Sequence, residues 1–329
     1  MQKRKIWENF LQWVLPCVLL VIALVLSIYD FNNKMEIAIQ TVVDDQAEQI
    51  GLYYAAGVED KLKALGNITD AVASIMAARL DRGEAFLNEK LDTLMKASDA
   101  YMVVYCATNG TGFLNDRRQI DMTELNYYDS ILGETPHYLF TRSDGINGQM
   151  AFIYVCPITN SGNVNGYLLS YMEPAEMSDF FENSVYGDKA FFSLVDRNGT
   201  IMACYGATEG TKILQNDFWN SLKGVAESLG SWTLFDRQQQ KGDNGILHVN
   251  ENGVGKILCH FPIADTAWNL VVGIDESYLS GIRQSFRGPI VNLIVKISIS
   301  IAAALIVITV INVLVRIKAS EHSKVLEDK

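Results

Sequence analysis

The sequence lacks the patterns that catalysis and metal binding need. Its 329 residues include five cysteines and four histidines, and none of them forms the C-x-x-C or H-E-x-x-H pairs that metal sites use. No G-x-S-x-G, P-loop or G-x-G-x-x-G motif occurs in a suitable context, so no nucleophile or phosphate-binding loop is indicated. We therefore predict no cofactor, no metal and no catalytic residue in this chain.

Positive charge is also scarce. Lysine and arginine total 27 against 38 acidic residues, which gives a formal net charge of −11. Because nucleic acid binding needs a basic surface to contact the phosphates, this composition argues against nucleic acid as a partner.

The cysteines lie far apart in the sequence. Cys17 falls in an apolar run near the N-terminus, and Cys106, Cys156 and Cys259 each fall in an apolar, strand-like run. Such positions predict buried free thiols, and a Cys106–Cys156 disulfide outside the cell stays open as the alternative.

The chain does have a long apolar run near each end. Residues 11–29 and 297–315 are almost continuously apolar, and residues 289–296 lead into the second run. Each run is about 19 residues long, which is what one helix needs to cross the hydrocarbon core of a bilayer. We predict two transmembrane helices, at 11–29 and 289–315, in contact with the lipid bilayer.

The charges beside these runs predict an orientation. Basic residues occupy positions 3–5 before the first run, and Arg316 and Lys318 follow the second. Since basic flanks stay on the cytoplasmic side, both termini are expected in the cytoplasm and residues 30–288 outside the cell (inner or plasma) membrane. A cleaved signal peptide is the alternative at the N-terminus, but this run exceeds the roughly 7–15 residues of such peptides and no A-x-A site follows it.

Between the two runs the pattern changes from helical to β. Residues 30–98 carry apolar side chains mostly at three- and four-residue steps, which predicts one long stalk helix. Near the membrane this stripe is suited to pair with a second copy of the chain, so we expect a homodimer. Residues 99–186 and 187–288 each have the strands and helices of an antiparallel α+β unit. We therefore expect an α+β fold. Residues 1–10 are expected to form the cytoplasmic N-terminus.

Strands are expected where β-branched and aromatic residues run between turn signals. The first unit has candidates at Ala100–Ala107, His137–Thr141, Met150–Pro157 and Gly166–Met172. The second has candidates at Ala190–Val195, Thr200–Cys204, Ser231–Phe235, Gly255–Pro262 and Trp268–Ile274. A hairpin turn is expected at Asp196–Gly199, and helices are expected at Phe218–Leu229 and Glu276–Phe286.

Both units end with the same order of elements. The first has Pro157-Ile158 in a strand, then a turn, the strand that begins Gly166-Tyr-Leu-Leu, an acidic residue and a helix. The second repeats this with Pro262-Ile263 and the strand Leu270-Val-Val-Gly-Ile-Asp275. With this order of strands and helices between two expected membrane spans, the chain resembles a double Cache sensor over residues 10 to 320.

The resemblance implies a membrane-distal PAS-like module at 99–186 and a membrane-proximal PAS-like module at 187–288. It implies that a small molecule binds, usually in the distal module, and that the second membrane helix carries the change to a cytoplasmic output. Residues 316–329 are then the start of a signalling helix. The expected output lies beyond this chain and is most often a diguanylate cyclase, a histidine kinase or a chemoreceptor; the missing HAMP-like module favours the cyclase. Alternatives are a complete two-span binding or scaffold protein and an ectoenzyme.

One subset of these sensors is similar to amino-acid binders, with an Arg two residues before Trp-Tyr, a later Tyr and an Asp that ends the last distal strand. In this chain Leu125 replaces the Arg, Tyr127-Tyr128 replace Trp-Tyr, and Tyr171 stands where the Asp is expected. The charges that would hold a carboxylate and an ammonium are missing from those positions. We expect a small ligand that is not a zwitterionic amino acid bound in that way, with Arg117 or Arg118 as other possible cations.

Five tyrosines and one arginine are the candidate ligand-binding residues. Phenol rings suit a ligand pocket and equally suit the core of a sheet, and the arginine is suited to an anion or to the surface. The candidates are Tyr127, Tyr128, Tyr138, Arg142, Tyr154 and Tyr171. The dipeptide Asp144-Gly145 is interpreted as a turn.

Overall fold

A computed structural model describes residues 2–79, 83–182, 184–206, 213–214, 217–251 and 253–327. It divides into two compact units, Asp44–Tyr278 and the pair of segments Met1–Val43 and Leu279–Lys329. In the second of these, many side chains lie outside the described part, including most of those before residue 25.

The N-terminal helix α1 runs over Gln2–Ala77, and α2 follows over Glu84–Ala97. The helix expected over 30–98 is therefore interrupted. Gly83, which immediately precedes α2, has a φ of 82°, a left-handed conformation that glycine adopts without strain. Within the unit Asp44–Tyr278, the buried residues of α1 recur at three- and four-residue steps, which places them on one face of the helix. They include Ala47, Tyr54, Val58, Leu62, Leu65, Thr69, Val72 and Met76.

Glycines let α1 approach the two modules closely. A Cβ at Gly51 would overlap the ring of Phe261, and one at Gly57 would overlap the ring of Phe180. These glycines interrupt the helical sequence pattern because aromatic rings occupy the space that their side chains would fill.

The distal module is a six-stranded antiparallel sheet in the order β3-β2-β1-β6-β5-β4. The expected strands at 100–107, 137–141, 150–157 and 166–172 are found, whereas β2 and β3 were not among the strands that the sequence predicted. The strands are β1 Met102–Ala107, β2 Thr111–Leu114, β3 Gln119–Asp121, β4 His137–Thr141, β5 Ala151–Asn160 and β6 Asn163–Met172. Short helices η2 (Met122–Glu124) and α3 (Tyr128–Ile131) follow β3.

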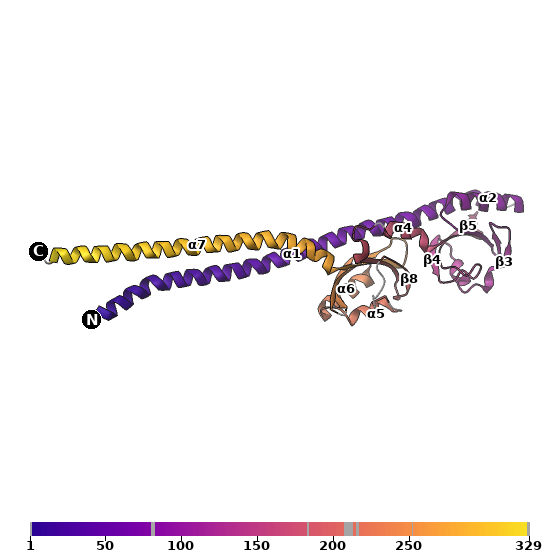
Figure 1. Cartoon of the computed structure of the whole chain (residues 1–329). Coiled ribbons are helices and arrows are strands. Elements are labelled where there is room, and N and C mark those ends of the chain that lie inside the picture. The colour runs from indigo at the N-terminus through magenta and orange to yellow at the C-terminus, as the bar shows by residue number, and fades with distance from the viewer. Residues whose placement is uncertain are drawn as a thin grey trace. The chain divides into compact units, whose positions relative to one another are not determined.

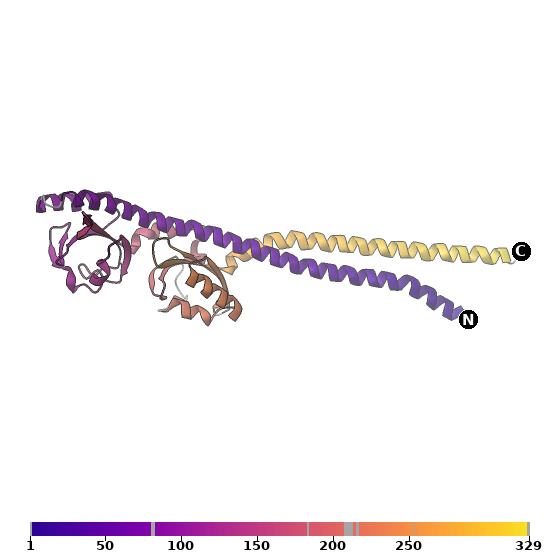
Figure 2. The same ribbon diagram turned by 180° about the vertical axis from the view of Figure 1, so that it is seen from behind.

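The proximal module is a five-stranded antiparallel sheet in the order β8-β7-β11-β10-β9. Its core is shared with α5 (Phe218–Lys223) and α6 (Leu229–Lys241), and Figures 1 and 2 show these two helices against one face of the sheet. The strands are β7 Ala190–Asp196, β8 Ile201–Gly206, β9 Gly245–Glu251, β10 Val254–Pro262 and β11 Trp268–Asp275. Between the modules lie η3 (Pro174–Met177), α4 (Ser178–Glu182) and η4 (Gly187–Lys189).

The strand expected at Ser231–Phe235 is wrong, because this segment lies in α6. Ser228 caps the helix by accepting a hydrogen bond from the Ser231 N–H at 3.1 Å. Trp232 and Phe235, three residues apart, both turn into the core. The strand that follows the helix is β9, which the sequence analysis did not identify. The expected helix at Phe218–Leu229 is shorter and ends at Lys223.

The hairpin predicted at Asp196–Gly199 is confirmed. Asp196 Oδ1 accepts hydrogen bonds from the N–H groups of Asn198 at 2.9 Å and Thr200 at 2.7 Å. Gly199 takes a φ of 87°, which closes the turn between β7 and β8 without strain.

Helix α7 runs over Glu276–Glu327 and contains Val291–Ile308, whose mean hydropathy is 2.4. Among the described residues, Val291–Ile308 is the one helical segment that is long and apolar enough to cross a membrane. The first expected span, 11–29, lies in α1, but most of its side chains are outside the described residues, so that span stays a prediction.

The described cysteines are free thiols, and Cys106, Cys156 and Cys259 are buried. Cys106 is in β1 and Cys156 is in β5, and β6 lies between these two strands. Because neighbouring strands are about 4.8 Å apart, two strand spacings exceed the reach of a disulfide. The alternative Cys106–Cys156 bridge is therefore excluded.

Candidate functional site

Three of the six candidate residues are strand tyrosines, and they fall on two different faces of the distal sheet. Ile153 of β5 pairs with Tyr171 of β6, and Tyr154 pairs with Ser170. Because side chains alternate along a strand, Tyr171 shares the face of Ile153, where the module's core cluster lies. Tyr154 points to the opposite face, which packs against α1.

Tyr138 and Tyr154 attach the sheet to α1. They are register partners, and their ring centroids are 4.8 Å apart. Tyr138 donates a hydrogen bond to the Leu62 carbonyl at 2.9 Å, and Tyr154 donates to the Asp70 carboxylate at 2.9 Å. Burial raises the pKa of Tyr138 to about 12, and burial together with Asp70 raises the pKa of Tyr154 as well. The structure therefore does not bring these two tyrosines together with the other candidates.

Tyr127 and Tyr171 belong to a buried network on the core face. Their hydroxyl oxygens are 3.1 Å apart. Tyr127 also donates to the Asp144 carbonyl at 2.7 Å, and Tyr101 donates to Asp144 Oδ2 at 2.8 Å. We call Tyr101, Tyr127, Asp144 and Tyr171 the Asp144 network. Asp144 and Tyr171 are fully buried.

Asp144 fixes the loop between β4 and β5. Its Oδ1 accepts hydrogen bonds from the N–H groups of Ile146 at 2.9 Å, Asn147 at 2.7 Å and Gly148 at 2.8 Å. Burial alone would raise the pKa of Asp144, but these hydrogen bonds and the one from Tyr101 outweigh it and hold the pKa below its ordinary value. The sequence interpretation of Asp144-Gly145 as a turn was correct locally but missed the buried carboxylate.

A cavity of about 530 Å³ lies next to this network. Its wall combines three partly buried apolar residues that pack on the core, Ile120, Leu125 and Ile146, with charged and polar side chains. Asp144 stands in the sequence between two wall residues, Ser143 and Gly145. The full lining is Arg118, Ile120, Asp121, Glu124, Leu125, Asn126, Ser143, Gly145 and Ile146.

Two positions in this wall bear on the amino-acid pattern. Leu125, which stands where the related binders have an Arg, lines the cavity. Arg118 also lines it and contacts Asp116 Oδ2 at 2.6 Å and Asn147 Oδ1 at 3.3 Å. The cavity therefore has a cation, but this cation comes from the β2–β3 turn and not from position 125, two residues before Tyr127.

Tyr128 and Arg142 lie apart from the cavity wall. Tyr128 is the first residue of α3 and packs, partly buried, on the core cluster. Arg142 directly follows β4 and is exposed. Within the described part of the chain, neither is among the residues that line the 530 Å³ cavity.

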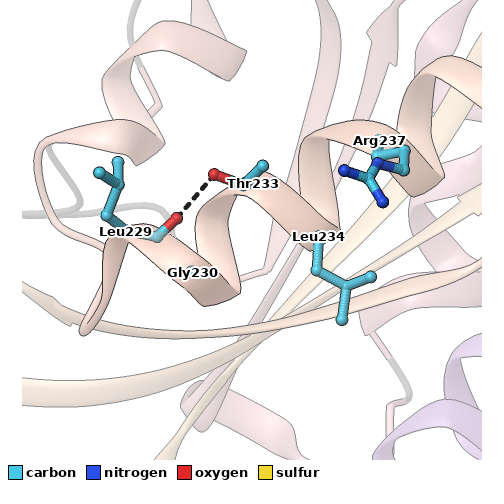
Figure 3. Close-up of a pocket in the computed structure, with 5 residues that line it drawn as sticks. All are labelled: Leu229, Gly230, Thr233, Leu234 and Arg237. Atoms are coloured by element: carbon cyan, nitrogen blue, oxygen red, sulfur yellow. Dashed lines mark hydrogen bonds between the residues drawn. The ribbon is translucent and has the colours of Figure 1, made fainter.

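A second hollow, of about 420 Å³, lies on the outer side of α6. Figure 3 shows Leu229, Gly230, Thr233, Leu234 and Arg237 around it. Leu229 and Leu234 are 71% and 56% exposed, and the Thr233 hydroxyl donates to the Leu229 carbonyl of its own helix at 2.8 Å. The hollow offers an open apolar surface with one cation, Arg237.

No protein-family model and no curated protein sequence matches the chain. Solved structures do match, and they are sensory domains. The extracellular domain of the putative histidine kinase rpHK1S-Z16 is 15% identical, with a TM-score of 0.55 over 72% of this chain and 96% of that one. The ligand-binding domain of the Pseudomonas fluorescens chemoreceptor CtaA, in complex with L-isoleucine, is 14% identical, with a TM-score of 0.57 over 74% and 97%. That of the Campylobacter jejuni chemoreceptor Tlp3, in complex with L-valine, is 14% identical, with a TM-score of 0.56 over 74% and 96%.

These likenesses establish the fold. A long N-terminal helix followed by two antiparallel α+β modules is the architecture that this chain shares with these extracellular and ligand-binding domains. The resemblance inferred from the repeated strand–turn–strand pattern is confirmed at this level.

Proposed function

We propose that this chain is the sensory part of a membrane receptor and that its distal module binds a small ligand. The observation that carries the proposal is the 530 Å³ cavity, which lies beside the buried Asp144 network. Its volume is that of a small-molecule site, and it combines apolar walls with a few polar groups, as ligand pockets do. The shared fold with receptor sensory domains supports the same function.

The cavity wall carries one cation, Arg118, and two carboxylates, Asp121 and Glu124, and we propose that Arg118 holds an anionic group of the ligand. Arg118 is the cation at the cavity, and its planar guanidinium is suited to a carboxylate or phosphate. The usual amino-acid positions hold Leu125 and Tyr171, so we propose that the ligand is not a zwitterion held by that pair of charges. Asp121 and Glu124 of the same wall are suited to an ammonium group, whereas Asp144 is fully buried and does not line the cavity. CtaA and Tlp3 are described in complex with amino acids, so both ligand classes need to be tested.

The route of the signal follows from the sequence of elements. Strand β11 continues directly into α7, which carries the apolar segment Val291–Ile308. We propose a two-pass protein with residues 30–288 outside the cell membrane, both termini in the cytoplasm and a homodimeric stalk. A ligand that prefers one arrangement of α7 would shift the population of that arrangement.

The output is proposed to lie outside this chain. The sequence alone favoured a diguanylate cyclase, whereas the named structural neighbours are the sensory domains of a putative histidine kinase and of chemoreceptors. We therefore place a histidine kinase or a chemoreceptor beside the cyclase as an equal candidate.

A thermal-shift panel tests the ligand proposal. The full chain in lipid nanodiscs would be heated with L-amino acids, with the amines that lack their carboxylate, and with the acids that lack their amine. A bound ligand raises the melting temperature because it stabilises the native state. The proposal expects a shift with the acids that is lost in Arg118→Gln and kept in Arg142→Gln, a matched change on the same module but outside the cavity wall.

Other outcomes separate the ligand classes. A shift with amino acids that requires both their charges, and that Leu125→Ala leaves intact but Glu124→Gln abolishes, would assign the ammonium to Glu124 and overturn our exclusion of zwitterions. A shift that Arg118→Gln and Arg142→Gln reduce equally would remove the cavity from the proposal.

A further inference from the structure

One histidine sits between the two helices that continue toward the predicted membrane segments. His248 is in β9 of the proximal module. Its Nε2 is 3.2 Å from Asp44 Oδ1 of α1, and its Nδ1 is 3.4 Å from Glu276 Oε1, in the first residue of α7. The ring therefore contacts α1 and α7 at once. All three residues belong to the unit Asp44–Tyr278.

The chemistry of these contacts depends on the charge of the ring. A carboxylate only accepts hydrogen bonds, and a neutral imidazole has one N–H donor and one bare nitrogen. Only the imidazolium, with two N–H donors, satisfies Asp44 and Glu276 together. In the neutral state one of the two contacts places a nitrogen lone pair against a carboxylate oxygen and becomes repulsive.

The surroundings are acidic and partly shielded from water. The side chain of His248 is 21% exposed, and those of Asp44 and Glu276 are 26% and 32% exposed. The Asp44 Oδ1 atom is itself buried, and His248 lies at ion-pair distance from it without the geometry of a hydrogen bond. Glu227, in the loop after α5, adds a third negative charge, and its N–H donates to the His248 carbonyl at 3.1 Å. On the neighbouring strand β10, Lys256 is paired with Glu251 at 2.8 Å.

Glu276 can lie close to β10 because residue 255 of that strand is a glycine. A Cβ at position 255 would meet the Glu276 carboxylate, so Gly255 leaves the space that this side chain occupies. The carboxylate that reaches His248 is therefore positioned by the sheet as well as by the ring.

We propose that His248 is a protonation-dependent latch: when charged it ties both α1 and α7 to the proximal sheet, and when neutral it releases one of the two helices. External pH would then set how firmly the start of α7 is held. This consequence for signalling rests on the proposed function, whereas the latch itself is a property of the fold and needs no ligand.

The direction with pH follows from the charges. The contact with the Asp44 carboxylate raises the pKa of His248 above its ordinary value of 6.5, and burial opposes this rise. A raised pKa in the folded state means that the latch contributes stability fully below pH 6.5. That stability is lost as the pH rises through the folded-state pKa. The latch is closed in mildly acidic surroundings and open in alkaline ones.

Hydrogen exchange of the full chain in nanodiscs tests the latch. Exchange of peptides that cover the start of α7 would be measured at pH 6.0 and pH 8.5 and corrected for the intrinsic pH dependence of the amide. We expect protection there to fall by up to about fivefold between these pH values, which corresponds to the loss of one partly exposed ion pair. In His248→Gln, which does not titrate, protection should be the same at both.

Two further variants make the test independent of any folding defect in His248→Gln. Glu276→Gln keeps the shape of its side chain and removes one carboxylate, so it should reduce the pH response. His137→Gln changes a histidine of the distal module whose ring nitrogens contact the Thr135 and Ser130 carbonyls, so it should keep the full response. A fall in protection that persists in both His248→Gln and Glu276→Gln, or protection that rises with pH in the native chain, overturns the latch. Neither result depends on whether the distal cavity binds a ligand.

Discussion

Replacement of Asp144 by asparagine should destabilise the distal module markedly, because its carboxylate accepts four hydrogen bonds. Three come from backbone N–H groups at 2.7 to 2.9 Å, and one comes from Tyr101 at 2.8 Å. In Asp144→Asn one oxygen becomes an NH₂ group that faces donors, and the other loses its charge. A hydrogen bond to a charged group contributes about 1.5–3 kcal/mol, so we expect a loss of roughly 2–3 kcal/mol.

The loss can be measured as a melting temperature. For a domain of this size 1 kcal/mol corresponds to about 2–4 °C, so Asp144→Asn should lower the melting temperature of the full chain by roughly 4–12 °C. Asp129→Asn is the matched control, since Asp129 is an exposed aspartate of the same module. If the two variants melt within about 1 °C of each other, the carboxylate does not hold the loop as described.

The pH dependence gives this prediction a second arm. Because the pKa of Asp144 is held below its ordinary value of 3.8, the unfolded chain binds the proton more tightly than the folded chain. The stability from this residue is therefore present above pH 3.8 and is lost as the pH falls through the folded-state pKa. The melting temperature of Asp144→Asn should fall less steeply with acid than that of the native chain.

Three further predictions concern other parts of the unit Asp44–Tyr278. His260 is fully buried in β10, and burial lowers its pKa to about 4. The free energy of unfolding should therefore fall by up to about 3 kcal/mol as the pH drops from about 6.5 to 4. In an acid titration this fall should be absent from His260→Phe and present in His137→Gln. Gly51→Ala should lower the melting temperature, because the new methyl group overlaps the Phe261 ring. Gly230→Ala in α6 should instead raise the free energy of unfolding by about 0.5–1 kcal/mol, because the nearest atom to the new methyl group is 4.0 Å away. Equal effects of the two variants would contradict the packing described. Tyr154→Phe removes the hydrogen bond to Asp70 that attaches the distal sheet to α1, and it should lower the free energy of unfolding by about 1–3 kcal/mol. It should not change the affinity for the ligand, and a change in affinity would place Tyr154 in the binding site.

Most of the strands were predictable because their sequences contrast with the turns around them. Asp196–Gly199 is an example: an aspartate, an asparagine and a glycine at fixed positions define a hairpin by local chemistry alone. Ser231–Phe235 was not predictable in this way, because Ser-Trp-Thr-Leu-Phe has local β propensity. The cap at Ser228 and the burial of Trp232 and Phe235 against the sheet made it helical, and tertiary packing overrides weak propensities.

The candidate site was harder to predict because it depends on strand register. Tyr154 and Tyr171 are both apolar-flanked strand tyrosines, and nothing in the sequence says that Ile153 rather than Tyr154 pairs with Tyr171. A shift of one residue would place both rings on the same face. Asp144 was missed for a related reason: only the closed loop brings its carboxylate beneath three backbone N–H groups and next to Tyr101.

The central claim, that the distal cavity is the ligand site, can be tested by filling each hollow with the same side chain. Ser143→Trp would occupy the 530 Å³ cavity, and Thr233→Trp would occupy the 420 Å³ hollow on α6. Binding of the compound that gives the largest thermal shift would be measured by calorimetry on the full chain in nanodiscs. We predict that Ser143→Trp abolishes binding and Thr233→Trp leaves it unchanged. Binding that survives in Ser143→Trp and is lost in Thr233→Trp would contradict the account.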